Sequence, residues 1–369
     1  MVKNKMEKII ELKRSDGTVV RYVKLSERSD TGQSNIFLVK NPDGQEELLK
    51  MYLRDKFDSN EDLELKEKGA AREIKTLLLA KEQGRDDLPE IINYGIVEPG
   101  FMDPLPALLM KPIKGKTLDQ VINSKDHNPT KEEFLKLSRE IGSPLTWAHN
   151  DASTKQIFHR DLSPSNIIIR DLDKKAIVID WSASRFGSGE TCVNTQAYDN
   201  LYYTAPEVRN GRKVTAATDV YSLAKVLQCY LIGKDKFERT YNGSPPKEAF
   251  SDLNLPSNII DNLFKATEEE PENRFKSIDE FVSALNEDTS LTTLKDNKLD
   301  IYKEIIFYDK EKEIISKYEK YGSVIGSLIP PSLLILKDVF SDGKFNASHL
   351  ALYGIVGFLG ALFGNILSF

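Results

Sequence analysis

The 369-residue sequence predicts an α+β fold, in which a small β-rich unit is followed by a larger helical unit. In the first 115 residues, short apolar or alternating runs are separated by turn residues and interrupted by one long helical pattern. After Gly115, helical patterns dominate as far as residue 285. Residues 345–369 contain no Asp, Glu, Lys or Arg, so an apolar end follows the two units.

Turn residues set the expected boundaries in the small unit. Asp16-Gly17 is typical of a hairpin turn, residues 41–44 form a second turn, and Gly84 marks the end of a helix. The predicted elements are strands within 9–39, a strand at 46–52, a helix at 61–83, and strands at 91–97 and 107–110.

The large unit combines helices with two short apolar strands. Gly142 and Pro144 lie within one helical pattern, where proline is expected to kink or break the helix. Residues 287–320 are strongly charged with apolar residues at helical spacing, which predicts a helical linker. The predicted elements are helices at 117–123, 131–149 and within 219–285, strands at 167–169 and 176–179, and a polar loop at 182–204.

The composition excludes several classes of protein. Hydrophobic residues make up 40% and charged residues 29%, which excludes global disorder. The net charge of −6 lacks the basic excess of a nucleic-acid-binding protein, so no nucleic-acid partner is expected. Cys192 and Cys229 are far apart and the four histidines are scattered, which offers neither a disulfide framework nor a zinc site.

The strongest chemical signal is the run from His159 to Asn166, which precedes a buried strand. Asp161 and Asn166 lie in this run, and Asp180 closes the next buried strand. A strand–loop–strand hairpin would bring the three side chains into one cleft. Their oxygens suit Mg²⁺, which prefers hard oxygen ligands. We therefore expect Asp161 to orient a nucleophilic hydroxyl while Asn166 and Asp180 hold metal.

These residues resemble the motifs of the eukaryotic-type protein kinases, in particular the serine/threonine kinases. His159-Arg160-Asp161 with Asn166 resembles the catalytic loop, and Asp180-Trp181-Ser182 stands where the family has Asp-Phe-Gly. The resemblance implies a bilobed kinase-like fold over residues 18–286, with a small lobe at 18–113, a large lobe at 114–286 and an N-terminal strand extension at 1–17.

Three later motifs extend the resemblance. Ala205-Pro206-Glu207 is similar to the end of the activation segment, and Asp219 to the start of the buried helix that follows. Arg274 is similar to the late family arginine and is expected to pair with Glu207. His159, Glu207, Asp219 and Arg274 are therefore assigned structural roles.

The small lobe carries the residues expected to bind ATP. Lys50 resembles the strand lysine that contacts the phosphates, and Glu73 the helix glutamate that pairs with it. The alternative is that both are solvated surface charges. Met110 is expected to be the gatekeeper of the adenine site and Ile113 to lie in the hinge. The glycine-rich loop retains only Gly32, so nucleotide binding is expected to be weaker or differently clamped.

Two further departures concern switching and acceptor choice. Ser182 replaces a glycine, which predicts a stiffer segment with metal binding retained. Ser163 stands at the position of the family lysine, and Asn200 at the position of its threonine partner, which leaves the phosphoacceptor class open. Besides a protein kinase that uses ATP and Mg²⁺, the alternatives are a binding pseudokinase and a small-molecule kinase.

Regulation is expected at the activation loop. Arg160 before Asp161 implies control by a phosphate on that loop, with Thr191 and Thr195 as acceptors and Ser184 and Ser188 behind them. The alternative is that these hydroxyls are only solvated.

The apolar end predicts membrane attachment. Residues 345–369 are long enough to cross about 30 Å of hydrocarbon as a helix, and a shorter apolar run covers 321–336. The alternative is a soluble helical cap on a fully cytoplasmic protein. A membrane-attached kinase would keep its catalytic lobes in the cytoplasm. A homodimer contact is expected on the small-residue face formed by Gly354, Gly357, Gly360 and Gly364.

Overall fold

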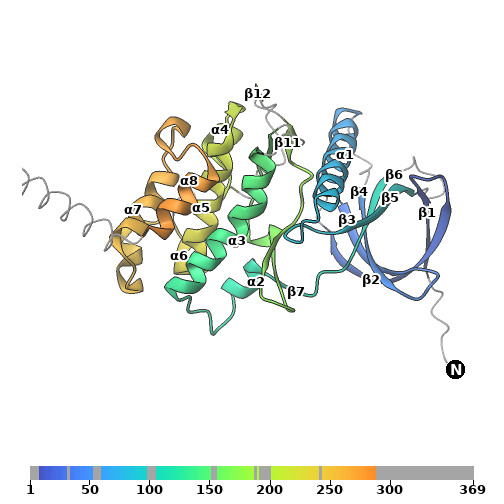
Figure 1. Ribbon diagram of the computed structural model, residues 1–369, viewed down its shortest axis with the longest axis horizontal. Helices are drawn as coiled ribbons and strands as arrows, with labels where there is room; N and C mark the ends of the chain where they lie inside the picture. Colours follow the sequence, from blue (N-terminus) through green and yellow to red (C-terminus); the bar gives the residue numbers. More distant parts are fainter. Residues whose placement is uncertain are drawn as a thin grey trace, which may run out of the picture. The chain divides into compact units, whose positions relative to one another are not determined.

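The computed structural model describes residues 8–30, 34–52, 60–97, 105–150, 156–186, 189–190, 201–240 and 243–287 (Figure 1). The chain divides into two compact units, Met1–Asp288 and Thr289–Phe369, and all described residues belong to the first. The predicted apolar end and, apart from residue 287, the predicted charged linker therefore lie outside the described residues. No helix within the described ranges is both long and apolar enough to span a membrane.

The small lobe is a closed antiparallel barrel with the strand order β1-β2-β3-β4-β6-β5. Gly17 and Gly44 both adopt φ of +84°, which glycine reaches without strain, and so close the two predicted turns. β1 pairs with both β2 and β5, so the barrel begins ahead of residue 18. The strands are β1 (Ile9–Arg14), β2 (Val19–Asp30), β3 (Ser34–Lys40), β4 (Glu46–Tyr52), β5 (Ile91–Val97) and β6 (Leu105–Met110).

Alternating side chains fill the barrel and leave one face for the long helix. Leu12, Tyr22, Leu49 and Leu109 point inward and are fully buried. Helix α1 (Asn60–Glu82) packs against β4, β5 and β6 and ends before Gly84, whose φ of +65° stops the helix. The predicted helix at 61–83 thus agrees closely with the observed one.

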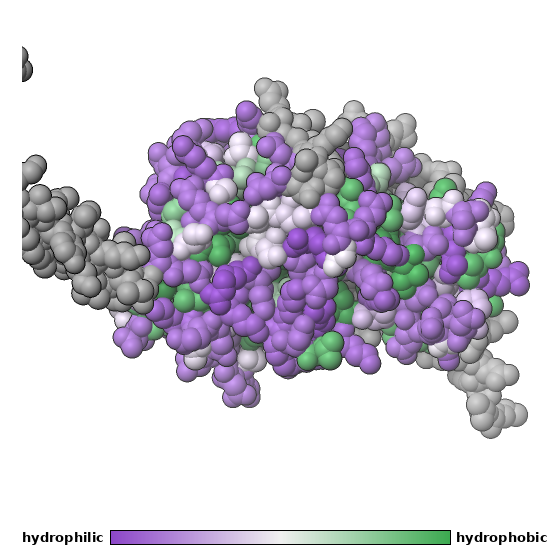
Figure 2. Space-filling model, viewed as in Figure 1, coloured by the Kyte–Doolittle hydropathy of each residue, from purple (hydrophilic) through white to green (hydrophobic). Residues whose placement is uncertain are grey.

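The large lobe is helical and surrounds a buried central helix, α5 (Ala216–Ile232) (Figure 1). Helices α3 and α8 pack together, and both contact α5, which explains why nearly all of α5 is buried. Hydrophilic side chains cover most of the face shown in Figure 2. The other helices are α2 (Leu118–Ile122), α3 (Lys131–Asn150), α4 (Pro206–Arg209), α6 (Lys234–Glu238), α7 (Ser257–Ala266) and α8 (Ile278–Asn286), with 3-10 turns η1 (Pro164–Asn166), η4 (Lys247–Leu253) and η5 (Pro271–Asn273).

The large lobe also contains several short strands. β9 (Ile167–Arg170) and β10 (Ala176–Val178) form the predicted hairpin, and β7 (Gly115–Thr117) joins them on the other edge of β9. The polar segment 182–204 is not loop throughout, because it also contains two short strands. These two-residue strands pair as β11 (Arg185–Phe186) with β8 (Ile157–Phe158) and β12 (Gly189–Glu190) with β13 (Lys213–Val214).

A kink or a break is expected at Pro144, and the expected break is wrong. Helix α3 continues from Lys131 to Asn150 with Pro144 inside it. Ile141 and Leu145 on α3 are fully buried, and this tertiary packing offsets the one hydrogen bond that proline cannot donate. Gly142 permits close contact with α8, because a Cβ there would lie 2.9 Å from a methyl group of Val282. The fold class predicted from the sequence, a β-rich small lobe and a helical large lobe, is confirmed.

Candidate active site

Lys50 and Glu73 form a buried ion pair between the barrel and α1. Lys50 lies on β4, a strand paired on both sides, which fixes its backbone. Its Nζ donates to Glu73 Oε2 at 2.8 Å, and both side chains are almost fully buried. The predicted contact is therefore present, and the alternative of two solvated surface charges does not hold for these side chains.

Asp180 joins this pair from the large lobe. It lies two residues beyond β10, which ends at Val178, one residue before the predicted strand end. Lys50 Nζ donates to Asp180 Oδ1 at 2.9 Å, and Ser182 Oγ donates to the same oxygen at 2.6 Å. Although burial raises the pKa of Asp180, the Lys50 charge and the Ser182 hydrogen bonds outweigh it and lower this pKa to about 2. The carboxylate is therefore ionised at neutral pH.

Asp161 and Asn166 meet in the loop before β9. Asn166 Nδ2 donates to the Asp161 backbone oxygen at 2.7 Å and to Asp161 Oδ2 at 3.1 Å. The backbone N–H of Ile179 donates to the Asn166 carbonyl at 2.9 Å, so the residue preceding Asp180 is fixed beside this loop. The predicted hairpin thus brings the loop that carries Asp161 and Asn166 next to the segment that carries Asp180.

The backbone of the loop that carries Asp161 is held by a carboxylate of α5. Asp219 accepts the backbone N–H groups of His159 and Arg160, each at 2.8 Å. It also accepts His149 Nε2 at 2.7 Å, a partner that the sequence analysis did not identify. These bonds hold Arg160 at a φ of +68°, an uncommon backbone conformation for a residue with a side chain. Asp219 therefore shapes the loop that presents Asp161.

His159 has a structural position. Its Nε2 lies 3.1 Å from the Ile179 carbonyl, and its ring packs edge-on against Trp181 at 4.7 Å between centroids. The imidazole is fully buried. It therefore braces the two segments that carry Asp161 and Asp180.

Glu207 and Arg274 form the second predicted ion pair. The guanidinium donates to both carboxylate oxygens at 2.9 and 3.0 Å, and both side chains are buried. Thr218 Oγ1 donates to Glu207 at 2.8 Å, and Arg274 also donates to the Ala217 carbonyl. The pair therefore connects α4, η5 and the start of α5, as the expected pairing requires.

Tyr52 was missed by sequence reasoning although a signal for it exists. It follows Lys50 by two positions on β4, and strand alternation places such residues on the same face. Its hydroxyl donates to Glu73 Oε2, the oxygen that also accepts Lys50. The sequence alone did not indicate which residue Tyr52 would contact.

The remaining predicted residues are only partly described. Met110 is buried at the end of β6, and Ile113 is half-buried in the segment that connects β6 to β7. Ser163 is buried, with its Oγ 2.9 Å from Ser165 Oγ. The predicted residues outside the described ranges are Gly32, Ser188, Thr191, Thr195, Asn200 and the glycines at 354, 357, 360 and 364.

The side-chain oxygens of Asn166 and Asp180 fit a magnesium ion that is bound partly by the protein and partly by phosphate groups. Among the described residues, no three His, Cys, Asp or Glu side chains group as metal ligands. Asp180 accepts its hydrogen bonds through Oδ1, and the Asn166 amide donates through Nδ2. Asp180 Oδ2 and Asn166 Oδ1 are therefore the oxygens suited to the cation. Mg²⁺ usually takes one or two protein oxygens and completes its shell with phosphate and water.

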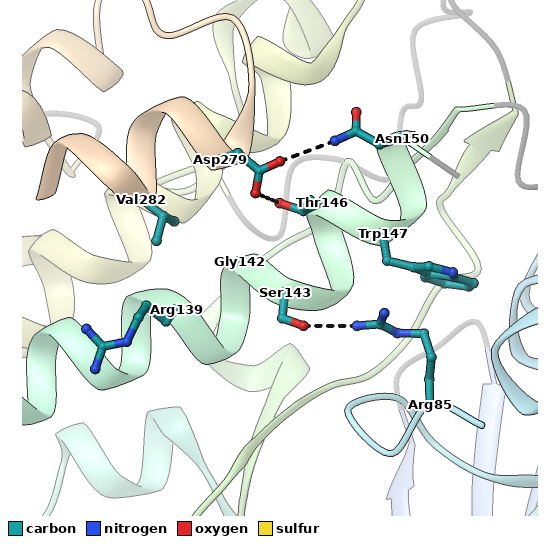
Figure 3. Close-up of a pocket in the computed structure, with 9 residues that line it drawn as sticks. All are labelled: Arg85, Arg139, Gly142, Ser143, Thr146, Trp147, Asn150, Asp279 and Val282. Atoms are coloured by element: carbon teal, nitrogen blue, oxygen red, sulfur yellow. Dashed lines mark hydrogen bonds between the residues drawn. The ribbon is translucent and has the colours of Figure 1, made fainter. Parts of the chain in front are cut away.

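A cavity of about 640 Å³ lies away from this site, between α3, α8 and the loop after α1 (Figure 3). Several of its polar side chains bond one another: Arg85 donates to Ser143, and Asp279 accepts from Thr146 and Asn150. It contains none of the predicted catalytic residues.

Comparisons with known proteins agree with this geometry. The protein kinase domain family model matches residues 32–298. A probable serine/threonine-protein kinase of Clostridium perfringens is 25% identical over 63% of this chain and 33% of its own length. The probable serine/threonine-protein kinase PknB of Lactococcus lactis is 23% identical over 57% of this chain and 34% of its own length. The match thus spans about a third of each relative.

A solved structure has the same fold. The kinase domain of Mycobacterium tuberculosis PknI aligns with a TM-score of 0.52 at 19% identity, over 72% of this chain and 94% of that domain. The family model covers well over half of the sequence, and the structure brings together the side chains that carry its motifs. The chain therefore belongs to the protein kinase domain family.

Proposed function

We propose that this protein is an ATP-dependent protein kinase that phosphorylates serine or threonine hydroxyls of proteins. The observation that carries the proposal is the buried contact of Lys50 with both Glu73 and Asp180, which assembles groups from both lobes. The relatives named as probable serine/threonine kinases support the acceptor class.

Each polar group has a role in phosphoryl transfer. Lys50, oriented by Glu73, holds the nucleotide phosphates, and Asp161 orients the acceptor hydroxyl and takes its proton. The hydroxyl oxygen bonds to the γ-phosphorus as the bond to the bridging β–γ oxygen breaks, and ADP leaves. Asn166 and Asp180 would hold the metal, which when bound neutralises charge on the phosphate oxygens. Positioning supplies most of the rate gain.

Asp161→Asn tests this proposal because it removes the base while leaving the side chain nearly unchanged in shape. Incubation with radiolabelled ATP, Mg²⁺ and a generic basic protein should show transfer by the wild type and at least about a 100-fold loss in the variant. Equal labelling by both would contradict the role of Asp161. Labelling of a metabolite but of no protein would identify a small-molecule kinase instead.

A pseudokinase is the second candidate, favoured by the single glycine, Gly32, in the predicted glycine-rich loop. Ligand binding to the folded state raises the melting temperature, by an amount that grows with ligand concentration over Kd. A kinase should be stabilised by ATP with Mg²⁺. No transfer and no stabilisation by Mg-ATP would support the pseudokinase.

We propose further that residues 345–369 attach the protein to a membrane and that Thr191 and Thr195 are autophosphorylated. The charge-free composition of 345–369 supports the first and the position of Arg160 before Asp161 the second. The full chain should float with lipid vesicles in a density gradient, and a chain ending at residue 344 should not. Equal flotation of both would contradict the attachment.

A further inference from the structure

Glu73 accepts two hydrogen bonds through a single oxygen. Lys50 Nζ and the Tyr52 hydroxyl both donate to Oε2, and both donors come from the same face of β4. Tyr52 is only 4% exposed, and the Lys50 ammonium lies 5.2 Å from the centre of its ring. The tyrosine therefore touches both members of the ion pair, and water has little access to the bond.

Among the charged side chains of this cluster, Glu73 is the one whose ionisation is most sensitive to a fall in pH. Lys50 and Tyr52 face it from β4, and Asp180 faces it from the segment after β10. Burial and, after it, the Asp180 charge raise the pKa of Glu73, whereas the Lys50 charge and the hydrogen bonds from Lys50 and then Tyr52 lower it, with a net rise. Burial also raises the pKa of Tyr52 well above its usual value, so this hydroxyl keeps its proton and remains a donor.

The other two groups keep their charge over the physiological range. The carboxylates of Asp180 and Glu73 raise the pKa of Lys50 against the effect of burial, and the pKa of Asp180 is lowered to about 2. As the pH falls, Glu73 is therefore the first of the three groups to change its protonation state. Protonation of Glu73 would remove the charge that orients Lys50.

We propose that Tyr52 is a positioning residue for phosphoryl transfer, which keeps the Glu73 carboxylate ionised and directed at Lys50. The inference rests on the proposed kinase function and extends it to a residue outside the family motifs. Loss of the hydroxyl leaves a buried carboxylate oxygen with one donor in place of two, and a buried charge that loses a partner favours its neutral form. The proposal therefore predicts a change in pH dependence as well as in rate.

Tyr52→Phe tests this role in the full chain, with Tyr22→Phe as the matched control. Tyr22 is also a buried barrel tyrosine, but its hydroxyl bonds Arg14. The acidic limb of kcat/KM for ATP should move to higher pH by about one unit in Tyr52→Phe, a tenfold loss on that limb. The rate should recover towards the wild-type value as the pH rises, and Tyr22→Phe should keep the wild-type profile.

A packing defect would give a different result, because it lowers the rate equally at every pH. An unshifted acidic limb in Tyr52→Phe, with an active wild type, would overturn the role of Tyr52 and leave the kinase function standing. If Tyr52→Phe does not fold, a fluorinated tyrosine at position 52 replaces it. Its more acidic hydroxyl should move the acidic limb to lower pH, and no movement would overturn the proposal.

A direct titration separates this proposal from the kinase function itself. The carboxyl carbon of Glu73 can be followed by NMR as the pH is changed, with no substrate present. A higher pKa of Glu73 in Tyr52→Phe than in the wild type supports the positioning role even if no phosphate is transferred. Equal pKa values would overturn it, whatever the enzyme assay shows.

Discussion

At the scale of single residues, the most informative departure from the family is Ser182. A serine in place of the family glycine predicts a stiffer segment after Asp180. Its Oγ donates to Asp180 Oδ1 at 2.6 Å, and its backbone N–H lies 3.3 Å from the same oxygen. A glycine could supply only the second bond. The serine therefore adds a bond to Oδ1, the oxygen that also accepts Lys50, and Oδ2 remains the candidate metal ligand.

Ser182→Ala should weaken metal binding without changing the fold. A hydrogen bond to a carboxylate contributes about 1.5–3 kcal/mol when buried, and the Asp180 side chain is 27% exposed, so we expect about 1 kcal/mol. The Mg²⁺ concentration for half-maximal activity should therefore rise roughly fivefold. Ser138→Ala is the matched control, since Ser138 is also a buried serine but its hydroxyl donates to the Leu135 carbonyl on α3. Equal Mg²⁺ requirements in both variants would contradict the assignment.

At the scale of elements, the Glu207–Arg274 pair joins segments that are far apart in the sequence. Arg274 follows η5 and donates to the Glu268 and Glu269 carbonyls as well as to Glu207 on α4. Both partners are desolvated, so each depends on the other for compensation of its charge. The pair therefore couples the activation-segment end to the helical core.

Arg274→Met should destabilise the large lobe strongly, because it leaves Glu207 buried without its counter-charge. Breaking one partner of such a pair costs about 3–5 kcal/mol of unfolding free energy. Arg212→Met is the control, since the Arg212–Glu270 pair spans 3.6 Å with both side chains more than half exposed, and its loss should cost less than about 1 kcal/mol. Urea unfolding measures both, and similar losses would contradict the account.

The sequence was informative where local chemistry decides the structure. The turns at Gly17 and Gly44 and the stop at Gly84 depend on backbone conformations that only a few residues adopt easily. The pairing of Lys50 with Glu73 followed from a resemblance to known motifs. The Tyr52–Glu73 bond and the continuity of α3 through Pro144 depend on packing between distant segments, which no local pattern specifies.

At the scale of the whole folded unit, both lobes contribute to one site. Asp86, after α1, accepts Lys175 Nζ at 2.5 Å and Arg170 at 3.3 Å, so the loop following α1 is attached to the β9–β10 hairpin. Trp147 on α3 donates to Gln83 at 2.6 Å beside it. These contacts hold α1, which carries Glu73, against the lobe that carries Asp161 and Asp180.

Mass spectrometry of the intact chain, incubated with Mg-ATP and a generic basic protein, tests the central claim most directly. The account predicts phosphate-sized mass increments on the basic protein, on the chain itself or on both, which appear with the wild type and are absent with Asp161→Asn. Unchanged masses with the wild type, or the same increments with Asp161→Asn, would contradict it.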